Sequence, residues 1–138
     1  MRIAKDFRWE MGHRLPFHEG QCVNLHGHSY KMMVEFEGDL DDKGMVLDYY
    51  VVKEVIQPLV DELDHTFMVK DDDRLLIDLL KQMNSKHVVV NFHSTAENMV
   101  YYFLDKIKSA NLPKNLRGIK VKIFETETTY AEDQITLE

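Results

Sequence analysis

The chain has 138 residues, of which 44% are hydrophobic and 30% charged, and its formal net charge is −7. This composition fits one soluble globular domain spanning residues 1–138. The acidic balance argues against a nucleic-acid partner, because a basic face supplies most of that affinity. No run approaches the ~18 apolar residues of a membrane helix, and the N-terminus lacks an apolar signal core. We therefore expect a cytoplasmic protein without a membrane partner.

The N-terminal part of the chain predicts strands joined by glycine-rich loops. Residues 2–11 and 27–37 alternate apolar and charged side chains, which is typical of strands. Between them, residues 12–25 hold the glycine, proline and asparagine of a loop. A turn cluster covers 39–44, and 44–48 is expected to return as a paired strand.

Helical patterns follow. Apolar residues over 52–63 have the spacing of a buried helical stripe, which Pro58 is expected to interrupt or kink. The run 71–73 is read as solvated acid at the start of a second, shorter helix with apolar residues over 75–83. A capping box at Ser94–Glu97 then predicts a third helix reaching Ile107, and as its last member Glu97 receives no catalytic role.

The remaining patterns complete the fold prediction. Residues 87–92 form a short β-branched run, residues 117–125 alternate again, and a last strand is expected from residue 130. The order of elements predicts an α+β domain in which an antiparallel sheet carries two main helices on one face.

The histidines are clustered, with four of the seven between residues 13 and 28. His26 and His28 share one face of a predicted strand, roughly 7 Å apart, and antiparallel pairing of the first two strands would bring His13 near them. Three imidazoles without a cysteine ligand are typical of a catalytic zinc site, although Fe(II), Ni(II) and Co(II) fit the same donors. Two solvent-facing strand histidines are the alternative interpretation. The other candidate ligands are His18, His65, His87 and His93.

Other side chains are candidates for chemistry. The only cysteine, Cys22, lies four residues before His26 and is either a base or nucleophile or a packed thiol. Asp64 and His65 follow the first helix, whose C-terminus favours an imidazolium, and are either catalytic or a simple charge pair. Glu125 ends a strand. Its carboxylate either accepts two hydrogen bonds from an amidine-like edge, such as a pterin presents, or belongs to a solvated turn.

These motifs, taken together, give the chain a family resemblance. In order and spacing the sequence resembles the 6-pyruvoyltetrahydropterin synthase family over nearly its whole length. The gap between Cys22 and His26 is similar to that of the bacterial 6-carboxytetrahydropterin synthase branch of queuosine biosynthesis. The motifs that carry the resemblance are Phe7–Leu15, Cys22–Tyr30, Gly44–Tyr49, Leu63–His65, Ser94–Asn98 and Glu125–Thr126.

The resemblance implies a fold and an activity. The fold is the T-fold, in which trimers form barrels that pair into homohexamers with active sites between subunits. The activity is a zinc-dependent lyase reaction that converts 7,8-dihydroneopterin triphosphate to 6-carboxytetrahydropterin, acetaldehyde and triphosphate. A pyruvoyltetrahydropterin synthase or related pterin side-chain lyase, and a non-enzymatic zinc- or pterin-binding module, are the alternatives.

The resemblance also implies a role for each matching residue. By this resemblance, the zinc ligands would be His13, His26 and His28, and Cys22 would abstract a proton. A relay on the other side of the substrate would consist of Asp64 and His65, expected from a different chain than Cys22. The pterin ring would be anchored by Glu125, with Thr95 nearby.

The sequence departs from the family pattern at three places near the pocket edge. The small residues usual before the first histidine are replaced by Glu10, Met11 and Gly12, and the proline usual before the threonine is Ser94. The segment 71–92 is also longer than expected. The departures leave the candidate zinc ligands intact. They affect the prediction of the exact substrate more than the prediction of the zinc site.

Overall fold

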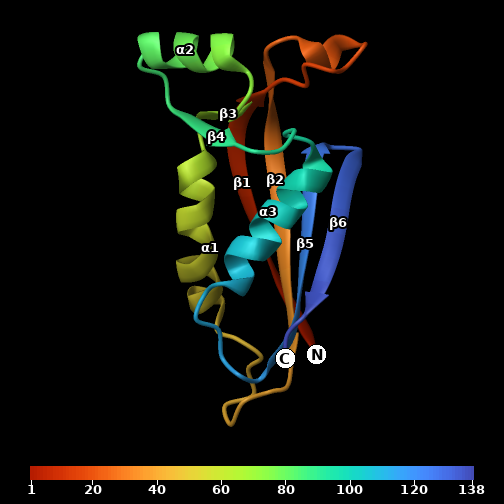
Figure 1. Cartoon of the computed structure of the whole chain (residues 1–138). Coiled ribbons are helices and arrows are strands. Elements are labelled where there is room, and N and C mark those ends of the chain that lie inside the picture. Colours follow the sequence, from red (N-terminus) through yellow and green to blue (C-terminus); the bar gives the residue numbers. More distant parts are fainter.

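The structure, a computed structural model, describes all 138 residues and consists of one six-stranded sheet with three helices (Figure 1). No helix is both long and apolar enough to cross a membrane. The elements are β1 (Arg2–His13), a 3₁₀ turn η1 (Gln21–Val23), β2 (His26–Gly38), α1 (Tyr49–Leu63), β3 (Thr66–Lys70), α2 (Arg74–Gln82), β4 (His87–Val90), α3 (Ala96–Lys108), β5 (Leu116–Thr126) and β6 (Thr129–Thr136).

The sheet is mixed, with strand order β4-β3-β1-β2-β5-β6. The pairs β1–β2, β2–β5 and β5–β6 are antiparallel, whereas β1–β3 and β3–β4 are parallel. The expected antiparallel sheet is therefore confirmed for β1, β2, β5 and β6, and it is wrong for β3 and β4, which pair in parallel. Parallel neighbours need a crossover connection, and α2 supplies it between β3 and β4. The α+β class is confirmed.

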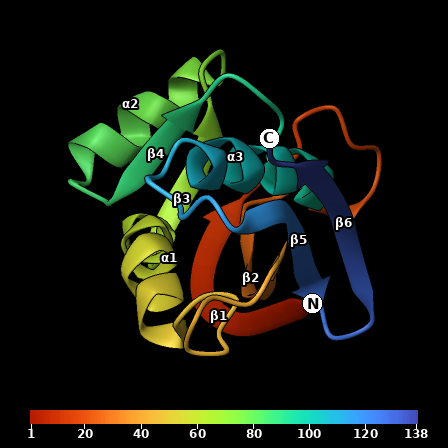
Figure 2. The ribbon, with the colours of Figure 1, turned by 90° about the horizontal axis from the view of Figure 1, so that it is seen from below.

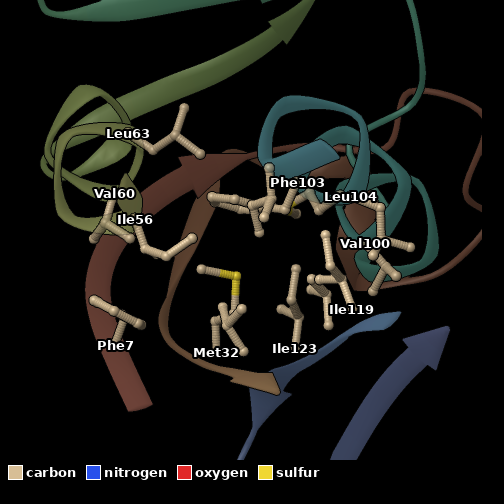
Figure 3. Close-up of a cluster of buried hydrophobic side chains, with 14 of the residues drawn as sticks. Phe7, Met32, Ile56, Val60, Leu63, Val100, Phe103, Leu104, Ile119 and Ile123 are labelled. Carbon is tan, nitrogen blue, oxygen red and sulfur yellow. The ribbon is translucent and has the colours of Figure 1, made fainter. Parts of the chain in front are cut away.

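The two long helices, α1 and α3, pack on one face of the curled sheet, as predicted (Figure 2). Along β1 and β2 every second side chain points to that face, which gives the strands their alternating burial. The apolar stripes of both helices meet these side chains in one core (Figure 3). Its largest fully buried members include Phe36, Met32, Ile56, Phe103 and Ile123.

The start of α1 differs from the sequence prediction. Residues 44–48 form no strand, because the Asp41 carboxylate accepts hydrogen bonds from the N–H groups of Lys43 and Met45 and closes a turn. Asp48 then caps α1 by accepting from the Tyr50 N–H at 2.8 Å. The helix continues through Pro58 without interruption.

The acidic run before α2 is not wholly solvated. Asp73 has a side chain only 7% exposed, and it accepts two hydrogen bonds of 2.8 Å from the Arg14 guanidinium. This bidentate pair ties the start of α2 to the residue that follows β1. α2 otherwise packs through a small apolar cluster of its own, made with Phe67 and Val69 of β3.

The cap of α3 lies one residue later than the predicted box. Thr95, not Ser94, is the N-cap, and its hydroxyl accepts from the Asn98 N–H at 3.1 Å. Glu97 is therefore not the box partner. Ser94 does not cap the helix. Its side chain is buried, only 3% exposed, and is therefore available for a contact within the fold.

Candidate functional site

The three predicted metal ligands meet where β1 ends and β2 begins. The register pairs His13 with His26 and Met11 with His28, so the three imidazoles share the helix-covered face. Their ring centroids lie 4.7 to 5.1 Å apart. One nitrogen of each lies within 4.8 Å of the others, an arrangement that could hold a metal ion.

Gly27 permits this close approach of the two strands. A Cβ at residue 27 would lie 2.9 Å from the Met11 carbonyl oxygen, inside van der Waals contact. With glycine between them, His26 and His28 flank a bare stretch of backbone that faces the end of β1. The His-Gly-His motif therefore fixes the strand spacing as well as the donors.

Neighbouring oxygens orient two of the rings. The Nδ1–H of His13 donates to the Ser94 carbonyl at 2.8 Å, with the Ser94 hydroxyl at 3.1 Å. The Nδ1–H of His26 donates to the Asn24 carbonyl at 2.7 Å. Because a carbonyl can only accept, both rings carry their proton on Nδ1 and present the lone pair of Nε2. The sequence pattern did not reveal these supporting contacts.

The charge state of the rings suits metal binding. His13 is fully buried, and burial lowers its pKa to about 4, despite the hydrogen bond to Ser94. Burial also lowers the pKa of His28, against an opposing contribution from Glu125. Both imidazoles are therefore neutral near pH 7, which is the form that ligates metals.

The unpaired atoms of the site test whether a cation fits. The Nε2 atoms of His13 and His28 are buried and lack a hydrogen-bond partner. One oxygen of Glu125 lies 3.0 Å from His28 Nε2 and 3.7 Å from His13 Nε2 without hydrogen-bond alignment. The His13 Nε2 is unprotonated, and a carboxylate facing its lone pair is unfavourable unless positive charge lies between them. The donor set therefore fits a bound metal ion.

Glu125 reaches the histidines through an irregularity of β5. The β5–β6 register shifts between Phe124 and Thr126, which leaves Glu125 at a bulge. Tyr30 lies beneath the cluster, with its ring 5.5 Å from that of His28 and its buried hydroxyl unpaired. Burial and the charge of Glu125 raise the Tyr30 pKa, so the phenol stays protonated.

Cys22 and Thr95 lie on segments that lead to this cluster. Cys22 is half-buried in η1, and its carbonyl accepts from the Leu15 N–H at 2.8 Å, closing the loop between β1 and β2. The thiol does not belong to the group of metal-ligating atoms. Thr95 directly follows Ser94, the partner of His13, and its hydroxyl is engaged as the α3 cap.

Asp64 and His65 lie on the opposite face of the β1–β2 ladder. In the β1–β3 register Met11 pairs with Thr66, which sets His65 beside Glu10 on the outward face. His65 lines a pocket of about 430 Å³ with Glu10, Ser29 and His28, although the register directs the His28 imidazole to the other face. Within one chain, therefore, the predicted relay and the three-histidine cluster face away from each other.

The two side chains of the predicted relay contact each other. His65 Nδ1 lies 3.1 Å from Asp64 Oδ1, which also accepts from the Glu10 N–H at 2.9 Å. That backbone hydrogen bond, with the contact to His65, lowers the pKa of the Asp64 carboxyl, so Asp64 is ionised at neutral pH.

The other candidate ligands are not brought to the cluster. His18 Nδ1 accepts from the Gly20 N–H, and His87 Nδ1 contacts the Ser85 carbonyl. The ring of His93 packs on Phe17, 4.6 Å between centroids. Only His13, His26 and His28 form a group with metal-ligating geometry.

Comparison with known proteins identifies the family. The sequence profile of "6-pyruvoyl tetrahydropterin synthase" matches residues 2–134. The chain belongs to this family. A 6-carboxy-5,6,7,8-tetrahydropterin synthase of Haemophilus influenzae is 33% identical, with 96% of this chain and 98% of that protein aligned. One of Aquifex aeolicus is 34% identical over 94% of this chain and 95% of that protein.

Solved structures of the family have the same fold. A 6-pyruvoyltetrahydropterin synthase of Plasmodium vivax superposes with a TM-score of 0.80 at 18% identity, covering 99% of this chain and 98% of that one. The Caenorhabditis elegans enzyme gives 0.71 at 26% identity, covering 100% and 96%. The predicted T-fold, and the prediction of an enzyme of the tetrahydropterin synthase type, are thereby confirmed.

Proposed function

We propose that the chain is a zinc-dependent 6-carboxytetrahydropterin synthase. It would convert 7,8-dihydroneopterin triphosphate and one water to 6-carboxytetrahydropterin, acetaldehyde and triphosphate, as a cytoplasmic step of queuosine biosynthesis. The names of the relatives support the reaction. The observation that carries the proposal is the cluster of three imidazoles, in which the unpaired Nε2 atoms of His13 and His28 face one carboxylate.

The cluster and Glu125 would form the binding half of the site. His13, His26 and His28 would hold the zinc ion, which when bound polarises the side-chain oxygens of the substrate. Glu125 would turn from the histidines to accept two hydrogen bonds from the amidine edge of the pterin, with Thr95 at the pocket edge. This anchoring would fix the ring so that the side chain of the substrate can extend to the zinc ion.

Proton transfer would come from the two sides of the substrate. Cys22, on the loop that leads into β2, would abstract a proton from the substrate side chain as thiolate. His65 would exchange protons on the opposite side, with the ionised Asp64 orienting its ring and stabilising the imidazolium. A base and an acid on opposite sides suit a reaction that moves protons between neighbouring carbons and oxygens.

The opposite placement of the two halves supports a site shared between chains. The His65 pocket opens on the outward face of the β1–β2 ladder, whereas the histidine cluster lies on the helix-covered face. One substrate would therefore contact His26 of one chain and His65 of another. We propose the homohexamer, a pair of trimers, as the assembly that joins them.

The test is turnover with product identification. Zinc-loaded protein mixed with 7,8-dihydroneopterin triphosphate should release acetaldehyde and yield 6-carboxytetrahydropterin by mass spectrometry. Formation of pyruvoyltetrahydropterin without acetaldehyde would assign the related synthase reaction instead. The Cys22→Ala variant should keep its zinc and lose at least about a hundredfold in kcat. Failure of the zinc-loaded wild type to consume the substrate would contradict the proposal.

A further inference from the structure

His65 holds an unusual backbone conformation. It directly follows the C-cap of α1 with φ of 55°, in the left-handed region that glycine usually occupies at this position of a helix end. A residue with a side chain is strained in that conformation. Such conformations persist only where neighbouring groups hold them. The contacts around His65 therefore show what fixes the direction of its ring.

Main-chain groups of β1 supply the first set of contacts. The His65 N–H donates to the Glu10 carbonyl at 2.7 Å, and the Glu10 N–H donates to the Asp64 carboxylate at 2.9 Å. Glu10 thus holds the turn through both of its backbone groups. Neither contact depends on the Glu10 side chain, which accepts instead from the Ser29 hydroxyl.

Lys86 supplies the contacts from the other side. Its Nζ donates to the carbonyls of Asp61 and Asp64, each at 2.8 Å. These carbonyls belong to the last turn of α1 and its cap, where helices leave acceptors unpaired and favour cations. Lys86 also lines the same pocket as His65.

The long segment after β3 is what brings Lys86 to this position. α2 ends at Gln82, and Asn84, directly after the C-cap, is left-handed with φ of 53°; the Ser85 N–H then donates to the Leu80 carbonyl. The carbonyl of Lys86 then accepts from the Phe67 N–H at 3.1 Å, fixing the lysine at the start of β4. The segment between β3 and β4 thus sets the position of Lys86 beside the end of α1.

We infer that Lys86 is a positioning residue that holds the Asp64–His65 turn for proton transfer, and that the α2 segment serves to deliver it. This inference rests on the proposed function, because it assumes that His65 transfers a proton. The Asp61 and Asp64 carbonyls that Lys86 binds face solvent. Water would therefore take the place of the Lys86 ammonium group in a variant that lacks it. The fold would persist while the direction of the His65 ring becomes less defined, which lowers the rate more than the binding.

The experiment compares Lys86→Met with Lys86→Arg and with Lys114→Met. Methionine keeps the chain length and removes the donors, whereas arginine keeps donors and charge. Lys114 is an exposed lysine just before β5, at the opposite end of the sheet. With 7,8-dihydroneopterin triphosphate, Lys86→Met should lower kcat about tenfold at unchanged KM and zinc content. Lys86→Arg should recover most of the loss, and Lys114→Met should match wild type.

A double-mutant cycle separates positioning from general destabilisation. In a His65→Ala background Lys86→Met should have no further effect on kcat, because the group that it orients is gone. An equal tenfold loss in that background would overturn the inference. So would a Lys86→Met enzyme with the kcat of wild type.

Amide hydrogen exchange tests the same contact without turnover. Lys86→Met should raise the exchange rate of the His65 N–H, which is bonded to Glu10, at least about fivefold, with core amides of β2 unchanged. Unchanged exchange at His65 would overturn the inference. If wild type fails to consume the substrate while His65 exchange still rises, the proposed function fails but the structural role of Lys86 stands.

Discussion

At the scale of single residues, the orientation of the three candidate metal ligands depends on atoms that are not themselves ligands. His13 and His26 present Nε2 because carbonyl oxygens of Ser94 and Asn24 engage Nδ1. The sequence predicts the three ligands from strand periodicity and pairing alone. It could not reveal Ser94, because that contact joins residues 81 positions apart and depends on where α3 begins. The sequence indicates Ser94 only as the first residue of a capping box and as a departure from the family pattern, not as a partner of His13.

The hydroxyl of Ser94 provides a direct test of this support. Ser94→Ala removes the 3.1 Å contact to His13 and leaves the carbonyl in place. We expect zinc affinity to fall about tenfold, the lower end of the effect of losing an outer partner, measured by competition with a chromophoric chelator. Ser109→Ala, which removes an exposed hydroxyl at the end of α3, is the control and should leave affinity unchanged. Equal affinities for the two variants would show that the carbonyl alone orients His13.

Burial of His13 also predicts how metal-free protein responds to pH. The pKa is about 4 in the folded chain and about 6.5 when unfolded. The unfolded state therefore binds the proton first as pH falls. The free energy of unfolding contains the whole His13 contribution above pH ~6.5 and loses up to about 3 kcal/mol of it as the pH falls to ~4. His28, whose pKa is also lowered by burial, adds in the same direction.

Urea denaturation of chelator-treated protein between pH 7.5 and 4.5 measures this decline. Carboxyls whose pKa is lowered by folding, such as Asp64 and Asp41, also contribute to the free energy of unfolding. That contribution is lost only as the pH falls below the ordinary carboxyl pKa, which is lower than the pH range in which His13 titrates. In the His13→Gln variant the decline should be reduced by at least half. A slope identical to that of wild type would mean that His13 is not the group that titrates.

At the scale of elements, the sequence predicts those with long periodic patterns. β1 and β2 alternate over 12 and 13 residues, and the stripes of α1 and α3 recur over three or more turns. β3 is not predicted because its five residues follow α1 without a glycine or proline turn signal, the chain being redirected by Asp64 and His65. The parallel pairing of β3 and β4 depends on the α2 crossover, which periodicity does not reveal.

The cap of α1 offers a prediction at this scale. Asp48 accepts from the Tyr50 N–H at 2.8 Å, and α1 carries Val52, Ile56 and Val60 into the core. Asp48→Ala should lower the free energy of unfolding by about 1 kcal/mol, with kcat retained because the cap lies at the far end of α1 from His65. Asp42→Ala, in the preceding turn, is the matched control. Calorimetry of both variants measures the difference. Equal melting temperatures of the two variants would contradict a stabilising role of Asp48 as the N-cap.

At the scale of the whole molecule, the two faces of one sheet carry the two halves of the proposed site. The sequence could not show this, because the face of His65 depends on the β1–β3 register and on the length of α1. The arrangement turns an open sheet into a shared site only if another copy covers it. The prediction that follows concerns mixed assemblies, since a variant damaged in one half still carries the other half intact.

Subunit exchange between two inactive variants tests the shared site. Cys22→Ala chains keep His65, and His65→Ala chains keep Cys22, so random mixing should restore about a quarter of wild-type activity at interfaces that receive both intact halves. Native mass spectrometry confirms the exchange. Mixing Cys22→Ala chains with the double variant Cys22→Ala/His65→Ala should restore nothing, because no chain then supplies the thiol. Absence of recovery in the first mixture, once exchange is complete, would mean that both groups act within one chain, which the outward placement of the His65 pocket opposes.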